Sequence, residues 1–119
     1  MSALNPQTIQ ELAAELSPEI FTEILRTFRT DLGRLCAEMS AAAAAGQLEE
    51  YRRAAHGLAG AAGSVGARTV EALARRSMNR SGGDAVLELL PDVEAAVRAA
   101  LDELAMIEQG RGQSGTPSG

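Results

Sequence analysis

The sequence of 119 residues is poor in several residue types, and each shortage excludes a class of structure. Cys36 is the only cysteine, which excludes a disulfide within the chain and any site with several cysteine ligands. Aromatic residues make up 3% of the chain and β-branched residues are scattered, which favours helices over sheets. No stretch approaches the roughly 20 apolar residues that cross a bilayer, and the first residues lack the pattern of a signal peptide. We therefore expect an all-α, cytoplasmic protein with Cys36 in its core.

Lysine is also absent, so all 11 basic residues are arginine. With 16 acidic residues, the formal net charge is −5. A general affinity for nucleic acid or for an anionic membrane requires clustered positive charge, which an acidic chain does not supply. The composition therefore predicts a protein partner or a small ligand, and neither nucleic acid nor a membrane.

Two pairs of residues carry the signals that start a helix. Asn5 followed by Pro6, and Ser17 followed by Pro18, each combine an N-cap residue with proline in the first turn. They predict a short helix that ends near residue 16 and a long amphipathic helix that continues into the alanine run. Gly46 is the expected stop of this second helix.

Three more helices follow from apolar periodicity and glycine breaks. The third is expected at about residues 47–64 and the fourth at about 67–80, before the break at residues 81–83. Asp84 can cap the fifth helix. Pro91 either kinks that helix or marks its true first turn.

The number and character of these helices predict the fold and the domain organisation. Four substantial amphipathic helices joined by short breaks fit an antiparallel four-helix bundle, with the short first helix lying across one end. Residues 1–109 form this single domain, and the glycine-rich residues 110–119 are expected to be a disordered tail or linker. A monomer is expected, because one small bundle uses most of the apolar residues.

The only histidine, His56, lies on the third predicted helix, opposite its apolar side. At roughly 100° per residue, the aliphatic residues and Tyr51 gather on one arc and His56 points outward. The residues beside His56 on the outward side, which are the candidate docking residues, are Arg52, Arg53, Ala59, Gly60 and Gly63. The alternative to a functional role is a solvated surface histidine of no consequence.

Three glycines surround or follow His56 within one helix, namely Gly57, Gly60 and Gly63. Each glycine inside a helix costs about 0.5–1 kcal/mol relative to alanine, so something other than helix stability favours them. Bare backbone beside an exposed nucleophile leaves room for another protein's active site. For Gly57 and Gly63, the alternative is that they permit close helix packing or mark an early helix end.

The segment Ala55-His56-Gly57-Leu58-Ala59-Gly60-Ala61-Ala62-Gly63-Ser64-Val65-Gly66-Ala67 resembles the signature of histidine-containing phosphotransfer (HPt) domains of two-component phosphorelays. The matching features are the histidine, an aliphatic residue two places on, a glycine four places on, a run of small residues, and a glycine ten places on followed by alanine. The resemblance also covers the helix order from about Thr8 to Ile107. It implies that His56 is the phosphoacceptor and that Gly60 gives a receiver domain room to approach with its aspartate.

The resemblance also implies a set of partners and a mode of action. The partners are a response-regulator receiver domain and a sensor histidine kinase, and catalysis belongs to them, so the chain is a phosphoryl carrier and not an enzyme. No cofactor or metal site is expected in this chain, because Mg²⁺ belongs to the receiver. A metal-binding bundle is disfavoured independently, since the chain has one histidine and no Glu-x-x-His pair.

The sequence departs from the HPt pattern at Ala59, where such domains usually have a lysine that helps to hold the phosphoryl group. The chain must therefore do without this charge or use Arg52, Arg53 or Arg75. Two alternatives stay open. One is a helical adaptor that binds receiver domains without being phosphorylated, and the other is the phosphoacceptor domain of a chemotaxis-type histidine kinase.

Overall fold

The computed structural model describes residues 3–113, except for the side chains of residues 80–84 and 111–113. The helices are α1 (Pro6–Glu15), α2 (Pro18–Ala44), α3 (Leu48–Val65), α4 (Arg68–Arg76), the 3₁₀ helix η1 (Arg80–Leu89) and α5 (Leu90–Gln113). The described part of the chain contains no strand. The prediction of an all-α fold with a short first helix is confirmed.

The first two helices begin where the sequence signals predict. The Asn5 side-chain oxygen accepts a hydrogen bond from the backbone N–H of Gln7 at 3.0 Å, and the Ser17 hydroxyl oxygen accepts one from Ile20 at 3.3 Å. In both helices the proline occupies the first turn, where a missing N–H costs nothing. Gly46, with φ of 69°, follows the end of α2 as expected.

The region between α4 and α5 differs from the prediction. The fourth helix ends at Arg76, about four residues early, and a 3₁₀ helix that the sequence did not predict occupies residues 80–89. The Tyr51 hydroxyl donates a hydrogen bond to the carbonyl oxygen of Val86 at 3.1 Å, which ties this segment to α3. Pro91 is the second residue of α5, so it marks the first turn and not a kink. The Asp84 cap lies outside the described side chains.

The last helix is longer than expected. Helix α5 continues through Gly110 to Gln113, so the predicted boundary at residue 109 falls inside a helix. A single glycine weakens a helix by about 1 kcal/mol but does not end it. Residues 114–119, where the sequence predicts a disordered tail, lie outside the described residues.

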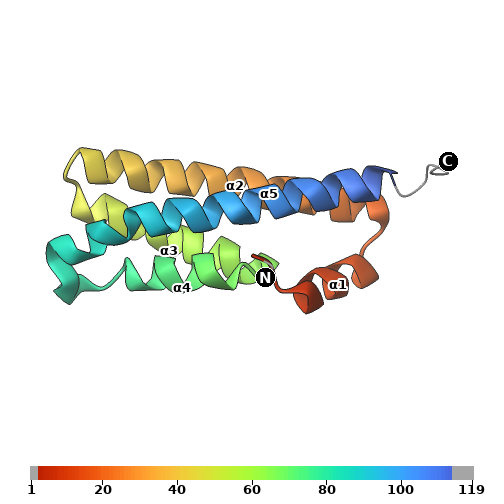
Figure 1. Ribbon diagram of the computed structural model, residues 1–119, viewed down its shortest axis with the longest axis horizontal. Coiled ribbons are helices and arrows are strands. Elements are labelled where there is room, and N and C mark those ends of the chain that lie inside the picture. Colours follow the sequence, from red (N-terminus) through yellow and green to blue (C-terminus); the bar gives the residue numbers. More distant parts are fainter. Residues whose placement is uncertain (1–2, 114–119) are drawn as a thin grey trace.

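Helices α2, α3, α4 and α5 form an antiparallel bundle (Figure 1). Helix α2 packs against α3 and α5, and α4 packs against the same two helices, which closes a ring of four. Helix α1 packs against α2 below the end of the long helices that α3 and α4 do not reach (Figure 1). No described helix is long and apolar enough to span a bilayer.

The core lies along the axis of this ring. Its largest fully buried side chains are Phe21, Leu25, Leu32, Met39, Tyr51, Leu58, Val65, Val70, Val93 and Leu104. Cys36 is also buried, as predicted. The buried face of α3 is mostly alanine, which lets α2 and α4 lie close to both sides of the helix that carries His56.

Candidate functional site

The imidazole of His56 lies on the exposed side of α3, near the middle of the helix. The opposite side of this turn is fixed in the core by Ala55 and Leu58, which are fully buried. At about 100° per residue, the direction midway between these two buried side chains lies about 130° around the helix from His56, so their burial turns His56 to the surface. The predicted outward orientation is confirmed.

A shallow hollow of about 380 Å³ surrounds His56. Its lining residues are Glu49, Arg52, Arg53, His56 and Met78. The structure therefore brings both arginines of the predicted docking set to the histidine. Glu49 and Met78 were not among the predicted site residues. Met78 lies in the turn that follows α4, and only the packing of α4 on α3 places it beside His56.

The two arginines in this hollow differ in accessibility. Arg52 is 13% exposed and forms an ion pair of 2.7 Å with Glu49. Arg53 is 76% exposed and lies 3.4 Å from Glu50. Exposed ion pairs of this kind contribute little to stability and are easily rearranged. Arg53 is therefore the more accessible cation for a partner that approaches His56.

The three glycines of α3 have three different environments. A Cβ atom at Gly60 would meet no heavy atom within 4 Å outside its own helix backbone, so this position is open to solvent. A Cβ atom at Gly57 would lie 3.0 Å from Leu35 Cδ2 of α2, and one at Gly63 would lie 3.0 Å from Glu71 Oε2 of α4. Close packing, the alternative interpretation, therefore holds for Gly57 against α2. Gly63 is exposed and only the flexible Glu71 carboxylate lies near it, so Gly60 and Gly63 both lie on the open side of α3.

Ala59 does not lie on the surface where the sequence placed it. The residue is 3% exposed, so its methyl group is not available to a partner. The reason is that Ala59 shares a side of the helix with Ala55 and Ala62, four residues before it and three residues after it, and both are fully buried. The outward face beside His56 is accordingly formed by Arg53, Gly60 and Gly63, with Arg52 at its edge.

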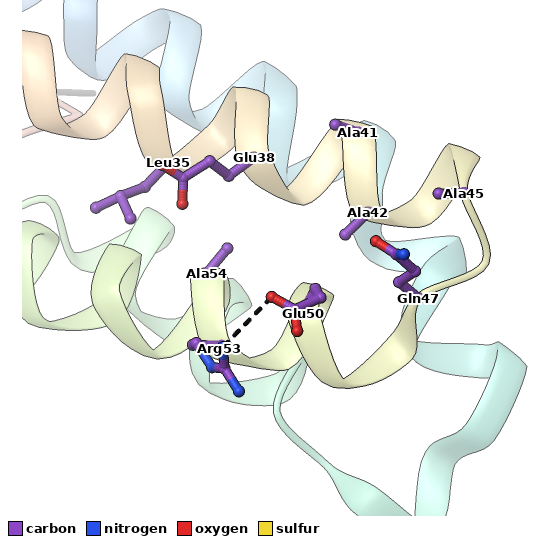
Figure 2. A pocket seen from close by; sticks show the side chains of 9 residues that line it. All are labelled: Leu35, Glu38, Ala41, Ala42, Ala45, Gln47, Glu50, Arg53 and Ala54. Carbon is purple, nitrogen blue, oxygen red and sulfur yellow. Dashed lines mark hydrogen bonds and ion pairs between the residues drawn. The ribbon is translucent and has the colours of Figure 1, made fainter.

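A second and larger groove, of about 620 Å³, lies between the end of α2 and the start of α3 (Figure 2). Its lining residues are Leu35, Glu38, Ala41, Ala42, Ala45, Gln47, Glu50, Arg53 and Ala54. Arg53 lines both this groove and the hollow around His56. The groove itself has only alanine, leucine, amide and ion-paired side chains in its wall, and no nucleophile.

Among the described residues, His56 is the best-placed nucleophile. Burial raises the pKa of the Cys36 thiol, with Glu94 as a second cause, so this sulfur stays protonated at neutral pH. Burial likewise raises the pKa of the Tyr51 hydroxyl. No group of three or more potential metal ligands occurs in the described part of the chain. An exposed imidazole with bare backbone on one side and arginines on the other is suited to accept and release an anionic group.

The Hpt domain family model matches residues 23–107, which is more than two thirds of the chain and includes α3 with His56. No curated protein and no solved structure matches the chain. The chain belongs to the Hpt domain family. Hpt domains are typically phosphoryl carriers that interact with receiver domains and kinases, so the chain has a phosphotransfer role in phosphorelay signalling.

Proposed function

We propose that this member of the Hpt domain family accepts a phosphoryl group on His56 and exchanges it with the aspartate of a response-regulator receiver domain. The observation that carries the proposal is the open surface at the only histidine of the chain. His56 is exposed at a hollow, and one turn further on Gly60 leaves space where a side chain would otherwise stand.

The proposed transfer needs little chemistry from the chain itself. The unprotonated ring nitrogen of His56 attacks the phosphorus of the aspartyl phosphate, an N–P bond forms and the P–O bond breaks. The electron pair of the broken bond stays on the aspartate carboxylate, and the reverse reaction returns the phosphoryl group. In this proposal the Mg²⁺ ion that neutralises the phosphoryl oxygens is bound by the receiver, and no metal is required in the Hpt chain.

The proposed docking surface follows from the same geometry. The receiver covers His56 and lies over Gly60, where the backbone permits the closest approach. Arg53, exposed at the other end of the face, is available to the acidic residues of a phosphorylation site. The exposed Gly63 continues this surface beyond Gly60, whereas Gly57 packs against Leu35 of α2.

The experiment that tests this proposal is acid-labile phosphorylation. The protein is incubated with a phosphorylated receiver domain or with a sensor kinase and ATP. We expect a label that survives alkali, is lost in acid, and is absent from a His56→Gln variant with an unchanged circular dichroism spectrum. A folded protein that takes no label from a broad panel of phosphorylated receivers contradicts the proposal.

An adaptor that binds a receiver without being phosphorylated is the second candidate, and the alanine at position 59 favours it. The two candidates differ in their need for the histidine. Under the adaptor proposal, His56→Gln leaves both receiver binding and pathway output unchanged. A phosphoacceptor domain within a longer chemotaxis-type kinase remains a third proposal, and the complete open reading frame distinguishes it.

A further inference from the structure

Helix α4 carries a row of residues that runs alongside the phosphoacceptor face of α3. At steps of three and four residues the row contains Arg68, Glu71 and Arg75, and it continues to Met78 in the turn after the helix. Two of these residues lie beside the α3 face. Met78 lines the hollow of His56, and the Glu71 carboxylate lies over Gly63.

These two contacts fix the register between α3 and α4. The helices are antiparallel neighbours joined at Gly66 and Ala67 (Figure 1). Gly63 lies seven positions after His56 in α3, and Glu71 lies seven positions before Met78, which follows α4 in the opposite direction. Arg75, three residues before Met78, therefore lies across from Ala59, three residues after His56.

We propose that Arg75 is a positioning residue that supplies, from across the helix pair, the positive charge that Ala59 does not carry. This inference rests on the proposed function of His56 and deepens it. The small, buried side chain of Ala59 lets α4 lie close at this level of the bundle. The arginine of the adjacent helix is thereby placed one turn from His56 along the α3 surface.

Before phosphorylation, the Arg75 guanidinium is paired with the Glu71 carboxylate. The Arg75 Nη2 atom lies 2.7 Å from Glu71 Oε2 and the Nε atom lies 3.2 Å from the same oxygen. The arginine is 63% exposed, so this ion pair is weak and can open at little cost. A phosphoryl group offers close to two negative charges and several acceptor oxygens, which makes it a stronger guanidinium partner than one carboxylate oxygen.

The other two arginines are less suited to this role. Arg52 is largely covered and is paired with Glu49 at 2.7 Å on the side away from Gly60. Arg53 also lines the groove between α2 and α3 and is paired with Glu50 there (Figure 2). Of the three arginines, Arg75 is therefore the one best placed to replace the lysine that the family pattern has at the position of Ala59.

The test separates phosphorylation from docking by using phosphoramidate as a small phosphodonor. Its P–N bond breaks, His56 forms the new N–P bond, and ammonia leaves with a proton. Labelled wild type, Arg75→Ala, Arg75→Lys and the matched control Arg76→Ala are then mixed with one receiver domain, and the transfer rates are compared. Circular dichroism confirms that each variant is folded.

We expect Arg75→Ala to slow transfer by about tenfold, the effect of losing one charge-assisted hydrogen bond, and Arg76→Ala to stay within about twofold of wild type. Arg75→Lys restores much of the rate. A purely structural role of Arg75 predicts that Arg75→Lys transfers no faster than Arg75→Ala.

Three outcomes overturn the assignment. The first is an equal transfer rate for Arg75→Ala and Arg76→Ala, and the second is a tenfold loss in Arg53→Ala that Arg75→Ala does not show. The third is a loss in Arg75→Ala that Arg75→Lys does not restore. Failure of phosphoramidate to label His56 in the folded wild type is a different result, because it contradicts the proposed function and the inference with it.

Discussion

The pair of long helices, α2 and α5, differs from the α3–α4 hairpin in how its polar side chains are linked. In the long pair, polar links cross between helices, as in the two-pronged contact of Arg29 with Glu108 and the hydrogen bond from Ser40 to Glu94. In the hairpin, the ion pair of Glu71 and Arg75 joins residues of one helix, four apart in sequence.

This difference teaches where the molecule is rigid and where it can respond to a partner. A link between two helices resists their separation, and Glu108 is only 9% exposed in its contact with Arg29. A pair within one exposed helix turn can open without moving the backbone. The long pair therefore acts as scaffold, and the hairpin presents charged groups that can change partners.

The largest effect is expected from a substitution in the buried core of the scaffold. Leu32, on α2, is fully buried in the bundle, and Leu32→Ala should lower the free energy of unfolding by about 2–5 kcal/mol, measured by urea denaturation. His56→Ala, on the exposed face of the hairpin, should change it by less than about 0.5 kcal/mol while abolishing phosphorylation. A large stability loss in His56→Ala contradicts the division between scaffold and site.

An intermediate effect is expected from blocking the gap at Gly60. Gly60→Arg places a long side chain over the approach to His56 and should slow transfer from a phosphorylated receiver by at least about tenfold, since a small misplacement of reacting groups is costly. Gly110→Arg is the matched control, because Gly110 also lies in a helix with no neighbouring atom within 4 Å. Both variants should fold. Transfer rates that remain equal to wild type in both exclude docking over Gly60.

The smallest effect is expected from removing single ion pairs, one between two helices and one within a helix. Arg29→Ala removes the cross-helix contact with Glu108 and should cost about 1 kcal/mol of unfolding free energy in dilute salt. Arg34→Ala removes an exposed pair with Glu38 within α2 and should cost about 0–0.5 kcal/mol. Urea denaturation of the two variants gives the comparison. Equal costs contradict the view that cross-helix links hold the scaffold.

The features that the sequence predicted are those with local causes. Each of α1 and α2 begins with an N-cap residue that is directly followed by proline, so Asn5 and Ser17 predicted where the two helices start. The outward direction of His56 follows from the periodicity of a single helix. The absence of a disulfide follows from counting cysteines, and the burial of Cys36 follows from its place in an apolar pattern.

The features that the sequence did not predict depend on how helices pack. The early end of α4 and the 3₁₀ helix after it involve the contact of Tyr51 with Val86, 35 residues away. Ala59 was placed on the surface because its own helix leaves it beside His56, whereas α4 covers it. Met78 lines the hollow around His56 because of the same packing between α3 and α4. Periodicity within one helix contains no information on the register of its neighbour.

The turn between α3 and α4 also bears on the order of folding. Gly66 is left-handed, with φ of 76°, and its carbonyl oxygen accepts the N–H of Asn5 at 2.8 Å, while the backbone of Ala3 contacts the Glu103 carboxylate. Asn5 thus contacts a residue 61 positions further along the chain, and Ala3 contacts one 100 positions further along. Contacts of such long range close only after the intervening helices have assembled. The stretch that leads into α1 should therefore be among the last to settle, and the first to detach when the bundle begins to unfold.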